Sequence, residues 1–184
     1  MSLPRHIASP PVVLRVFTLA DAPRVAELCG DWQVAQTTAL IPHPYSLEMA
    51  QSFINACREA CETGPMPTYA IARAEDGVLV GAIGMTSTPE AGESLGYWVG
   101  RPHWGIGYAT AAARAMLALA FSRLGIDAMT AIHLVRNPAS GRVMAKCGMA
   151  EVRREMRTHR GELAEFRVWS IDAAGWERAT QRSW

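Results

Sequence analysis

The sequence of 184 residues lacks the features that mark several large classes of protein. No apolar run reaches the roughly 18–20 residues that a membrane-spanning helix needs, and residues 1–11 contain no hydrophobic segment of the kind found in signal peptides. The formal net charge is only +1 at pH 7, whereas proteins that bind nucleic acids or membrane surfaces usually present a strongly basic face. We therefore expect a cytoplasmic protein with neither a nucleic acid nor a membrane as its main partner.

Cysteine is scarce, and its spacing fits neither a disulfide framework nor a metal site. The chain has four cysteines, at positions 29, 57, 61 and 147. None of them lies in the closely spaced pairs typical of zinc sites, and Cys57 and Cys61 are one helical turn apart. We expect buried free thiols and no bound metal.

The most informative stretch runs from residue 95 to residue 124. Residues 95–99 form a short apolar and aromatic strand, and the turn that follows contains Gly105 and Gly107. A helix is expected after the turn, because apolar residues recur at helical spacing up to Gly125 (Ala113, Met116, Leu117, Ala120, Phe121 and Leu124). Unpaired backbone N–H groups and the helix dipole then favour a phosphate or pyrophosphate. A tight connection that binds nothing is the alternative.

Two well-known phosphate-binding loops do not fit this turn. No Gly-Lys-Ser/Thr follows it, so it is not the loop of the nucleoside-triphosphate enzymes. It also lacks a third glycine at the spacing of the dinucleotide-binding motif.

The residues around the turn resemble a different family. Tyr97-Trp98, followed by Trp104-Gly105-Ile106-Gly107-Tyr108-Ala109-Thr110, is similar to the acetyl-CoA loop of the GNAT N-acetyltransferases. Within that superfamily the closest resemblance is to the RimJ/RimL branch, which acetylates protein amino-termini and related amines. Residues 137–149 resemble a second family segment, which begins at an asparagine and ends in Lys-x-Gly. The resemblance covers about residues 12–171.

The chain is predicted to form a single domain, residues 1–184, with seven strands and four helices. Helices are expected after Asp21, after Ser46, before Gly125 and after Asn137. Asp76-Gly77 and Arg160-Gly161 predict hairpin turns. The strands are expected over residues 12–17, 68–73, 78–86, 95–99, 129–135, 151–159 and 162–171. This order predicts a mixed α+β fold with mostly antiparallel strands, and the resemblance implies a GNAT-type sheet that splays at the acetyl-CoA site and is flanked by helices.

The resemblance implies acetyl-CoA as co-substrate and assigns residues to hold it. Trp98 and Val99 would pair with the pantetheine arm, and Asn137 would hydrogen-bond that arm, although Asn137 could equally be a plain helix cap. The loop would hold the pyrophosphate through Trp104, Gly105, Ile106, Gly107, Tyr108, Ala109 and Thr110. Ser140 is also expected to lie at this site.

The candidate catalytic residues match the family pattern less closely than the residues of the loop do. Many GNAT enzymes protonate the leaving thiolate with a tyrosine seven residues after the asparagine, but Met144 stands there. Ser140 matches the serine proposed for this role in the RimJ/RimL branch; a helix-turn serine bonded to backbone is the alternative. The glutamate that often serves as general base is shifted by one position to Glu93, which a regular strand would turn to its other face. Other candidate bases are His43, His103, His133, Glu165 and bulk water.

The expected activity is direct transfer of an acetyl group to a primary amine, with a protein amino-terminus of the ribosomal-protein type as the preferred acceptor. The alternatives are a small amine, such as an antibiotic, a polyamine or an amino acid, and a non-catalytic acyl-CoA-binding module. Residues 42–66 contain only Glu48, Glu59 and Glu62 as acids, offset by Arg58, which disfavours a polycationic acceptor. The sequence leaves open whether the protein is a monomer or a homodimer.

Overall fold

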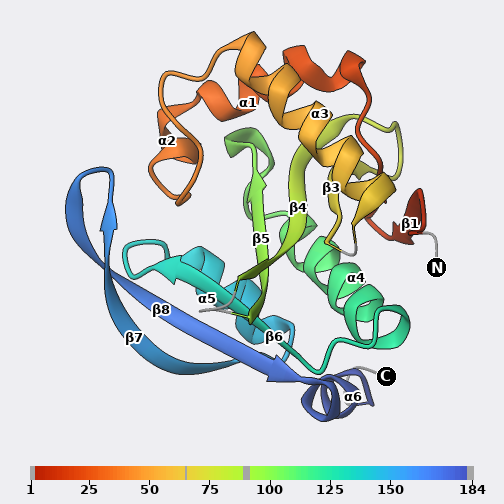
Figure 1. The fold of residues 1–184 in the computed structure, drawn as a ribbon, viewed down its shortest axis with the longest axis vertical. Helices are drawn as coiled ribbons and strands as arrows, with labels where there is room; N and C mark the ends of the chain where they lie inside the picture. Colours follow the sequence, from red (N-terminus) through yellow and green to blue (C-terminus); the bar gives the residue numbers. More distant parts are fainter. Residues whose placement is uncertain (1–2, 65, 89–91, 182–184) are drawn as a thin grey trace.

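The computed structural model describes residues 3–64, 66–88 and 92–181. Its strands form an eight-stranded sheet in the order β1-β2-β3-β4-β5-β6-β8-β7 (Figure 1). Neighbouring strands are antiparallel except β5 and β6, which are parallel. This confirms the predicted mixed, mostly antiparallel fold. The strands are β1 (His6–Ser9), β2 (Val12–Arg15), β3 (Thr68–Arg73), β4 (Leu79–Thr88), β5 (Gly92–Val99), β6 (Ala128–Leu134), β7 (Ala150–His159) and β8 (Glu162–Asp172).

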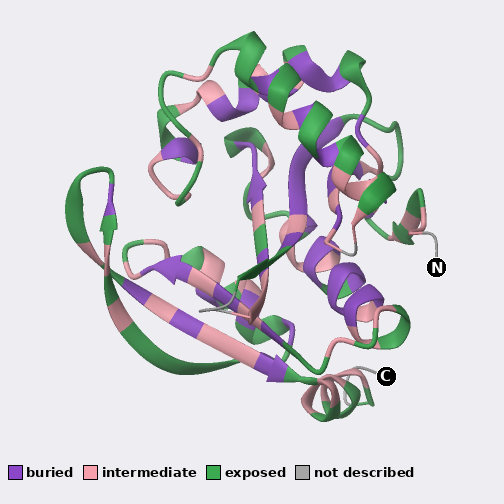
Figure 2. Cartoon of the chain, in the orientation of Figure 1, coloured by how far each residue is buried: buried purple, intermediate pink, exposed green. Residues whose placement is uncertain are grey.

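Helices cover both faces of the sheet and bury two apolar clusters, which Figure 2 shows as the buried sides of the elements. One cluster lies between the sheet and α4, and the other lies between the sheet and α1 and α3. No helix in the described residues combines the length and apolarity needed to cross a membrane. The helices are α1 (Ala22–Gly30), α2 (Trp32–Ala35), α3 (Leu47–Thr63), α4 (Tyr108–Arg123), α5 (Pro138–Lys146) and α6 (Ala173–Gln181), with the short 3₁₀ helices η1 (Leu19–Asp21) and η2 (Arg101–His103).

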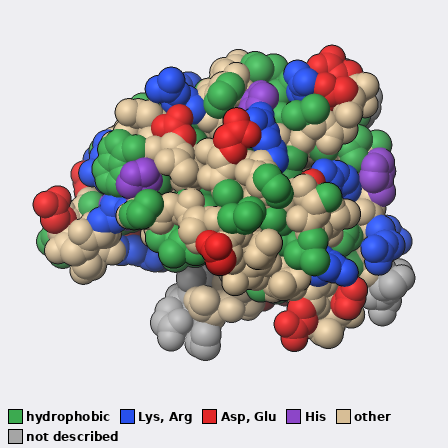
Figure 3. All heavy atoms as spheres, turned by 90° about the horizontal axis from the view of Figure 1, so that it is seen from above, with side chains coloured by type: hydrophobic (Ala, Val, Ile, Leu, Met, Phe, Trp, Pro, Cys, Tyr) green, Lys and Arg blue, Asp and Glu red, His purple; other side chains and the backbone are tan. Residues whose placement is uncertain are grey.

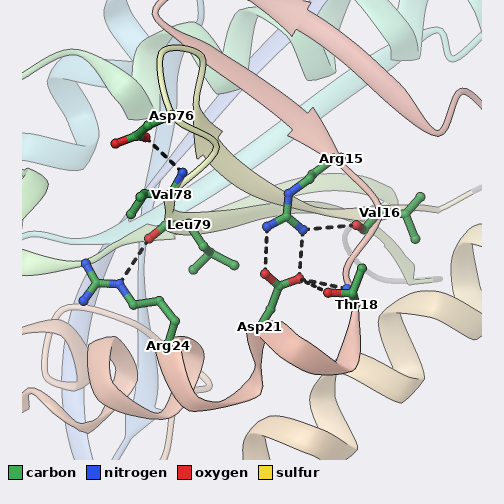
Figure 4. A network of polar contacts seen from close by, with 8 residues as sticks. All are labelled: Arg15, Val16, Thr18, Asp21, Arg24, Asp76, Val78 and Leu79. Carbon is green, nitrogen blue, oxygen red and sulfur yellow. Dashed lines mark hydrogen bonds and ion pairs between the residues drawn. The ribbon is translucent and has the colours of Figure 1, made fainter.

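A partly buried ion pair fixes the start of the first helical layer (Figure 4). The Asp21 carboxylate accepts hydrogen bonds from the Arg15 guanidinium at 2.7 and 2.8 Å and from the Thr18 backbone N–H at 2.8 Å. Burial raises the pKa of Asp21, but the bonds from Arg15 and Thr18 outweigh it and hold the pKa below its ordinary value. Next along the chain, Arg24 of α1 donates to the Leu79 carbonyl of β4 at 3.3 Å. These contacts join α1 to the sheet.

The cysteines are free in the structure. Cys29, Cys57 and Cys147 are buried, as predicted, whereas Cys61 is only partly buried. Burial raises the pKa of the Cys29 and Cys57 thiols to about 12 and that of Cys147 to about 11. These three thiols therefore stay protonated and unreactive at neutral pH.

The structure adds elements that the sequence patterns did not predict. The strand β1 and the helices α2 and α6 are additional, and β1 and α6 both pack on α4. This packing explains why α4 is buried beyond its predicted apolar stripe: Ala112, Ala115 and Leu119 are buried as well. An amphipathic stripe describes a helix covered on one side, and α4 is covered on more than one.

The hairpin between β3 and β4 forms where predicted, but its connection is longer than two residues. Residues 74–78 connect the strands, and the Gly77 N–H donates to the Arg73 carbonyl at 2.9 Å. Further along β4 the pairing with β3 shifts by one residue, and a Cβ on Gly81 would lie 2.2 Å from the Trp98 carbonyl oxygen of β5. A β-bulge and a close approach of two backbones therefore coincide at this glycine.

Candidate active site

The sheet opens in its middle, between the two parallel strands. Within their described residues, β5 pairs with β6 only at Ser94 with Thr130 and at Leu95 with Ala131. Beyond Leu95 the strands diverge (Figure 1), while β5 stays paired with β4 as far as Val99. The end of β5 therefore has one edge paired and one edge free, the edge that faces the gap.

The pairing geometry identifies the backbone groups that face this gap. The Gly100 N–H donates to the Val80 carbonyl at 2.8 Å, and peptide groups alternate sides along a strand. The N–H and C=O groups of Val99 and Tyr97 therefore point toward the gap, whereas those of Trp98 point toward β4. The Trp98 side chain lies in the cluster under α1 and α3. Of the two residues expected to pair with a bound pantetheine arm, Val99 has the matching backbone orientation, and Tyr97 shares it.

The glycine turn leads from the end of β5 into the N-terminus of α4. Gly105 and Gly107 have φ values of +78° and +102°, which side chains strongly disfavour, and a Cβ on either would meet nothing within 4 Å. The first hydrogen bond of α4 runs from the Ala111 N–H to the Gly107 carbonyl at 3.0 Å, and no side chain caps this described helix end. The N–H groups of residues 108–110 are therefore left without helical acceptors. The uncapped helix end on which the prediction of an anion site depends is therefore present, and the bound anion itself stays a prediction.

Trp104 braces the turn against the strand. Its indole Nε1 donates to the Val99 carbonyl at 2.6 Å, and 44% of the residue surface stays exposed. The bond occupies the carbonyl of Val99 that faces the gap but leaves the N–H of Val99 on the same side. Trp104 thus sets the distance between the glycine turn and the free edge of β5.

Asn137 caps α5 and also holds a distant segment. Its side-chain carbonyl accepts from the Ser140 N–H at 3.3 Å, which is the helix-cap geometry. Its amide donates to the Thr37 carbonyl at 3.3 Å. The cap interpretation is therefore confirmed, and the contact with a pantetheine arm stays a prediction compatible with it.

Ser140 meets a partner that the sequence motifs did not identify. Its Oγ lies 2.8 Å from the hydroxyl of Tyr97, which also lies 3.2 Å from the Ser140 backbone carbonyl. Burial raises the pKa of Tyr97, so this phenol stays protonated. The alternation of side chains along β5 places Tyr97 on the face that carries Leu95 and Val99, the face toward α4. Met144, where many relatives have a tyrosine, is buried in the core.

The structure does not bring Glu93 to Ser140. The pairing between β4 and β5 contains no register shift, so Glu93 shares the face of Tyr97, about 13 Å earlier along the strand. Its Oε1 lies 3.5 Å from the Ser87 hydroxyl. Ser94 is the residue that faces the side of α1 and α3.

The other candidate bases lie in four separate environments. Burial and Arg24 lower the pKa of His103, and burial lowers the pKa of His133, so both rings are neutral at pH 7. None of the four contacts the Tyr97–Ser140 pair through a hydrogen bond recorded among the described residues. His43 is exposed with its ring 5.2 Å from that of Trp32, His103 lies 3.0 Å from Arg24, His133 is buried with Nδ1 2.8 Å from the Leu134 carbonyl, and Glu165 is 3.6 Å from Arg154.

Residues 31–45 belong to the region between the first two predicted helices, which the GNAT resemblance implies would line the acceptor side, and are here called the acceptor-side segment. A residue from the β7–β8 turn holds this segment in place. Arg160 donates to the carbonyls of Ala35 at 2.9 Å and Ile41 at 2.6 Å, and its guanidinium lies 5.1 Å from the centre of the Trp32 ring. Arg160 has a φ of +54°, an uncommon conformation for a side-chain-bearing residue. The role of Arg160 was missed because its partners are 119 and 125 positions away.

The mixed surface charge agrees with the formal net charge of only +1. Figure 3 shows acidic and basic side chains scattered among hydrophobic ones on the face that carries α1 and α3, with no extended patch of one sign. Across residues 3–64, 66–88 and 92–181, no three His, Cys, Asp or Glu side chains gather where they could hold a metal ion.

Comparison with known proteins relates this arrangement to a family. The model of the acetyltransferase (GNAT) domain matches residues 12–150. A GNAT-family acetyltransferase from Bacillus anthracis is similar in structure, with a TM-score of 0.81 and 22% identity over 92% of this chain and 99% of that one. Mycobacterium smegmatis RimJ, in complex with CoA-disulfide, has a TM-score of 0.78 and 21% identity over 94% of this chain and 89% of that one. The ribosomal L7/L12 α-N-protein acetyltransferase RimL, in complex with coenzyme A, has a TM-score of 0.80 and 16% identity over 92% of this chain and 99% of that one. At these identities the structural likeness concerns the fold.

Proposed function

Because the chain belongs to the GNAT acetyltransferase family, we propose that it transfers the acetyl group of acetyl-CoA directly to a primary amine. The observation that carries the proposal is the junction of two open backbone sites. The free edge of β5 ends at Val99, and the uncapped N-terminus of α4 begins at Tyr108. An acyl-CoA is long enough to use both, with its thioester arm on the strand and its pyrophosphate on the helix end.

The binding site is built mainly from backbone. Residues 106–110 donate to the pyrophosphate, where the helix dipole adds about half a positive charge. The pantetheine arm runs along the gap beside Tyr97 and Val99, and Asn137 closes the other side. That RimJ and RimL were solved with CoA or its disulfide supports this choice of ligand.

The chemistry follows from what aminolysis of a thioester requires. An uncharged amine attacks the acetyl carbonyl and forms a tetrahedral intermediate with a negative oxygen and a positively charged nitrogen. The Val99 N–H faces the gap and stabilises that oxygen. As the C–S bond breaks and the C=O bond re-forms, Ser140 gives its hydroxyl proton to the sulfur and accepts a proton from the nitrogen. Ser140 ends the step unchanged, and the products are the amide and CoA thiol.

We propose a protein amino-terminus as the acceptor. RimL, which shares the fold, is an α-N-protein acetyltransferase, and this supports the choice. The acceptor-side segment contains Asp31 as its single carboxylate, and that group pairs with Arg101 at 3.3 Å. A polycationic small amine would need several free carboxylates there. A single peptide amine needs none.

Calorimetric titration and one variant test the proposal. We expect acetyl-CoA to bind the purified protein, and Ser140→Ala to lower kcat at least about tenfold with unchanged acetyl-CoA affinity, because general acid catalysis contributes about 10²–10⁴ and a thiolate leaves fairly well unaided. Ser122→Ala, which removes an exposed hydroxyl from α4, is the control. Wild-type kcat in the Ser140 variant would remove this residue from the mechanism, and absence of acetyl-CoA binding would overturn the function.

A further inference from the structure

We infer that Tyr97 is a positioning residue that holds the Ser140 hydroxyl ready to protonate the departing sulfur. This inference rests on the proposed function and deepens it. The motif position for a catalytic tyrosine on α5 is occupied by Met144, which is buried in the core. Tyr97 brings a phenol to the same helix from β5, 43 positions away in the sequence.

The hydrogen bonds around Ser140 hold its backbone and its side chain separately. The Ser140 N–H donates to both the side-chain and the backbone oxygen of Asn137, at 3.3 and 3.2 Å. The Ser140 Oγ, 2.8 Å from the Tyr97 hydroxyl, would otherwise be free to rotate about a single bond. Two residues on separate elements therefore fix the serine at the edge of the gap where β5 leaves β6.

The phenol has one proton and two acceptors within reach, and this gives the pair two arrangements. In the first, Tyr97 donates to the Ser140 carbonyl at 3.2 Å and the serine donates to the phenol oxygen. In the second, Tyr97 donates to the serine Oγ, and the serine proton turns toward the gap. Only the second arrangement presents a proton to the sulfur. Rotation of two O–H bonds converts one into the other without moving any heavy atom.

Tyr97 acts through Ser140 and is not itself the proton source. Its ring is packed against the core cluster, where a phenolate would lose its hydration. A neutral phenol can still donate a hydrogen bond to the serine oxygen while that oxygen accepts the proton of the substrate nitrogen. Tyr97 thus keeps the same proton throughout the reaction.

The test is a double-mutant cycle on kcat. Tyr97→Phe keeps the ring and removes the hydroxyl, and we expect it to lower kcat about tenfold, the equivalent of one hydrogen bond, with the acetyl-CoA Kd unchanged. The double variant Tyr97→Phe/Ser140→Ala should have the kcat of Ser140→Ala alone, because Tyr97 has no other route to the reaction. Tyr69→Phe, which removes a hydroxyl bonded to the Pro4 carbonyl at 2.7 Å, should leave kcat unchanged.

The outcomes separate the inference from the proposed function. A double variant whose loss is the product of the two single losses would overturn the inference, as would wild-type kcat in Tyr97→Phe or a raised acetyl-CoA Kd. If the wild-type protein acetylates no amine, the function fails instead. Urea unfolding then still tests the contact itself. The shift in midpoint of the double variant should be smaller than the sum of the two single shifts, because both single variants remove the same hydrogen bond, and additive shifts would show that the two hydroxyls are independent.

Discussion

Gly107→Ala tests the glycine turn, because its effect on folding can be separated from its effect on binding. Gly107 has a φ of +102°, and a Cβ there would meet nothing within 4 Å. The substitution therefore adds backbone strain of about 1–3 kcal/mol without a clash. The turn can relieve that strain only by moving, which takes N–H groups off the pyrophosphate. Loss of one hydrogen bond to a charged group, about 1.5–3 kcal/mol, weakens CoA binding about 10- to 150-fold.

The assay compares two ligands and two variants by calorimetry. CoA contains the pyrophosphate, whereas pantetheine lacks it, so Gly107→Ala should weaken binding of CoA much more than that of pantetheine. Gly125→Ala is the matched control: its φ is +66°, its Cβ would also meet nothing within 4 Å, and it follows the opposite end of α4. We expect both variants to lose comparable stability. Equal CoA affinity in the two variants would refute the assignment of the turn to phosphate.

Two further predictions concern the acceptor side and the response to pH. Arg160→Ala removes contacts to the acceptor-side segment worth about 1 kcal/mol and should therefore raise the acceptor KM about fivefold. The acetyl-CoA Kd should stay unchanged. Steady-state kinetics and titration that gave a normal acceptor KM with a changed acetyl-CoA Kd would contradict this prediction. Asp21→Asn should lower the free energy of unfolding at pH 7 by about 1–3 kcal/mol. Because the folded pKa of Asp21 lies below its ordinary value of 3.8, the stabilisation by Asp21 is complete above that pH and is lost as pH falls through the folded pKa. In urea titrations, the difference in the free energy of unfolding between wild type and variant should become smaller in acid. A difference that does not change with pH would refute the role of the ion pair.

Local sequence signals predicted the helices and strands whose ends are marked by a capping or turn residue next to them in the chain. Ser46 caps α3 by accepting from the Met49 N–H at 3.3 Å, and Arg160-Gly161 forms the turn between β7 and β8. Each of these signals depends on residues close together in the chain. The strand β1 escaped prediction because its four residues, His6–Ser9, alternate too briefly to form a pattern.

The parts of the site that depend on packing could not be predicted in the same way. The glycine turn was predicted because the backbone N–H groups proposed to bind phosphate are next to one another in the sequence. The Tyr97–Ser140 contact depends on where α5 settles against a strand from which it is separated by the whole of α4 and β6. The sequence showed that the glutamate is displaced by one position to Glu93, but the face of the sheet on which Glu93 lies depended on whether β5 contained a bulge. The pairing of β5 with β4 contains no bulge.

The most direct test of the proposed activity is thiol release from acetyl-CoA in the presence of a lysine-free peptide with a free amino-terminus, measured against the same peptide with its amino-terminus already acetylated. We expect release with the free peptide, none above background with the blocked peptide, and an acetyl group on the amino-terminal nitrogen of the product. Acetyl-CoA binding without release from any peptide or small amine would contradict the proposed catalysis, and release only with small amines would contradict the proposed acceptor.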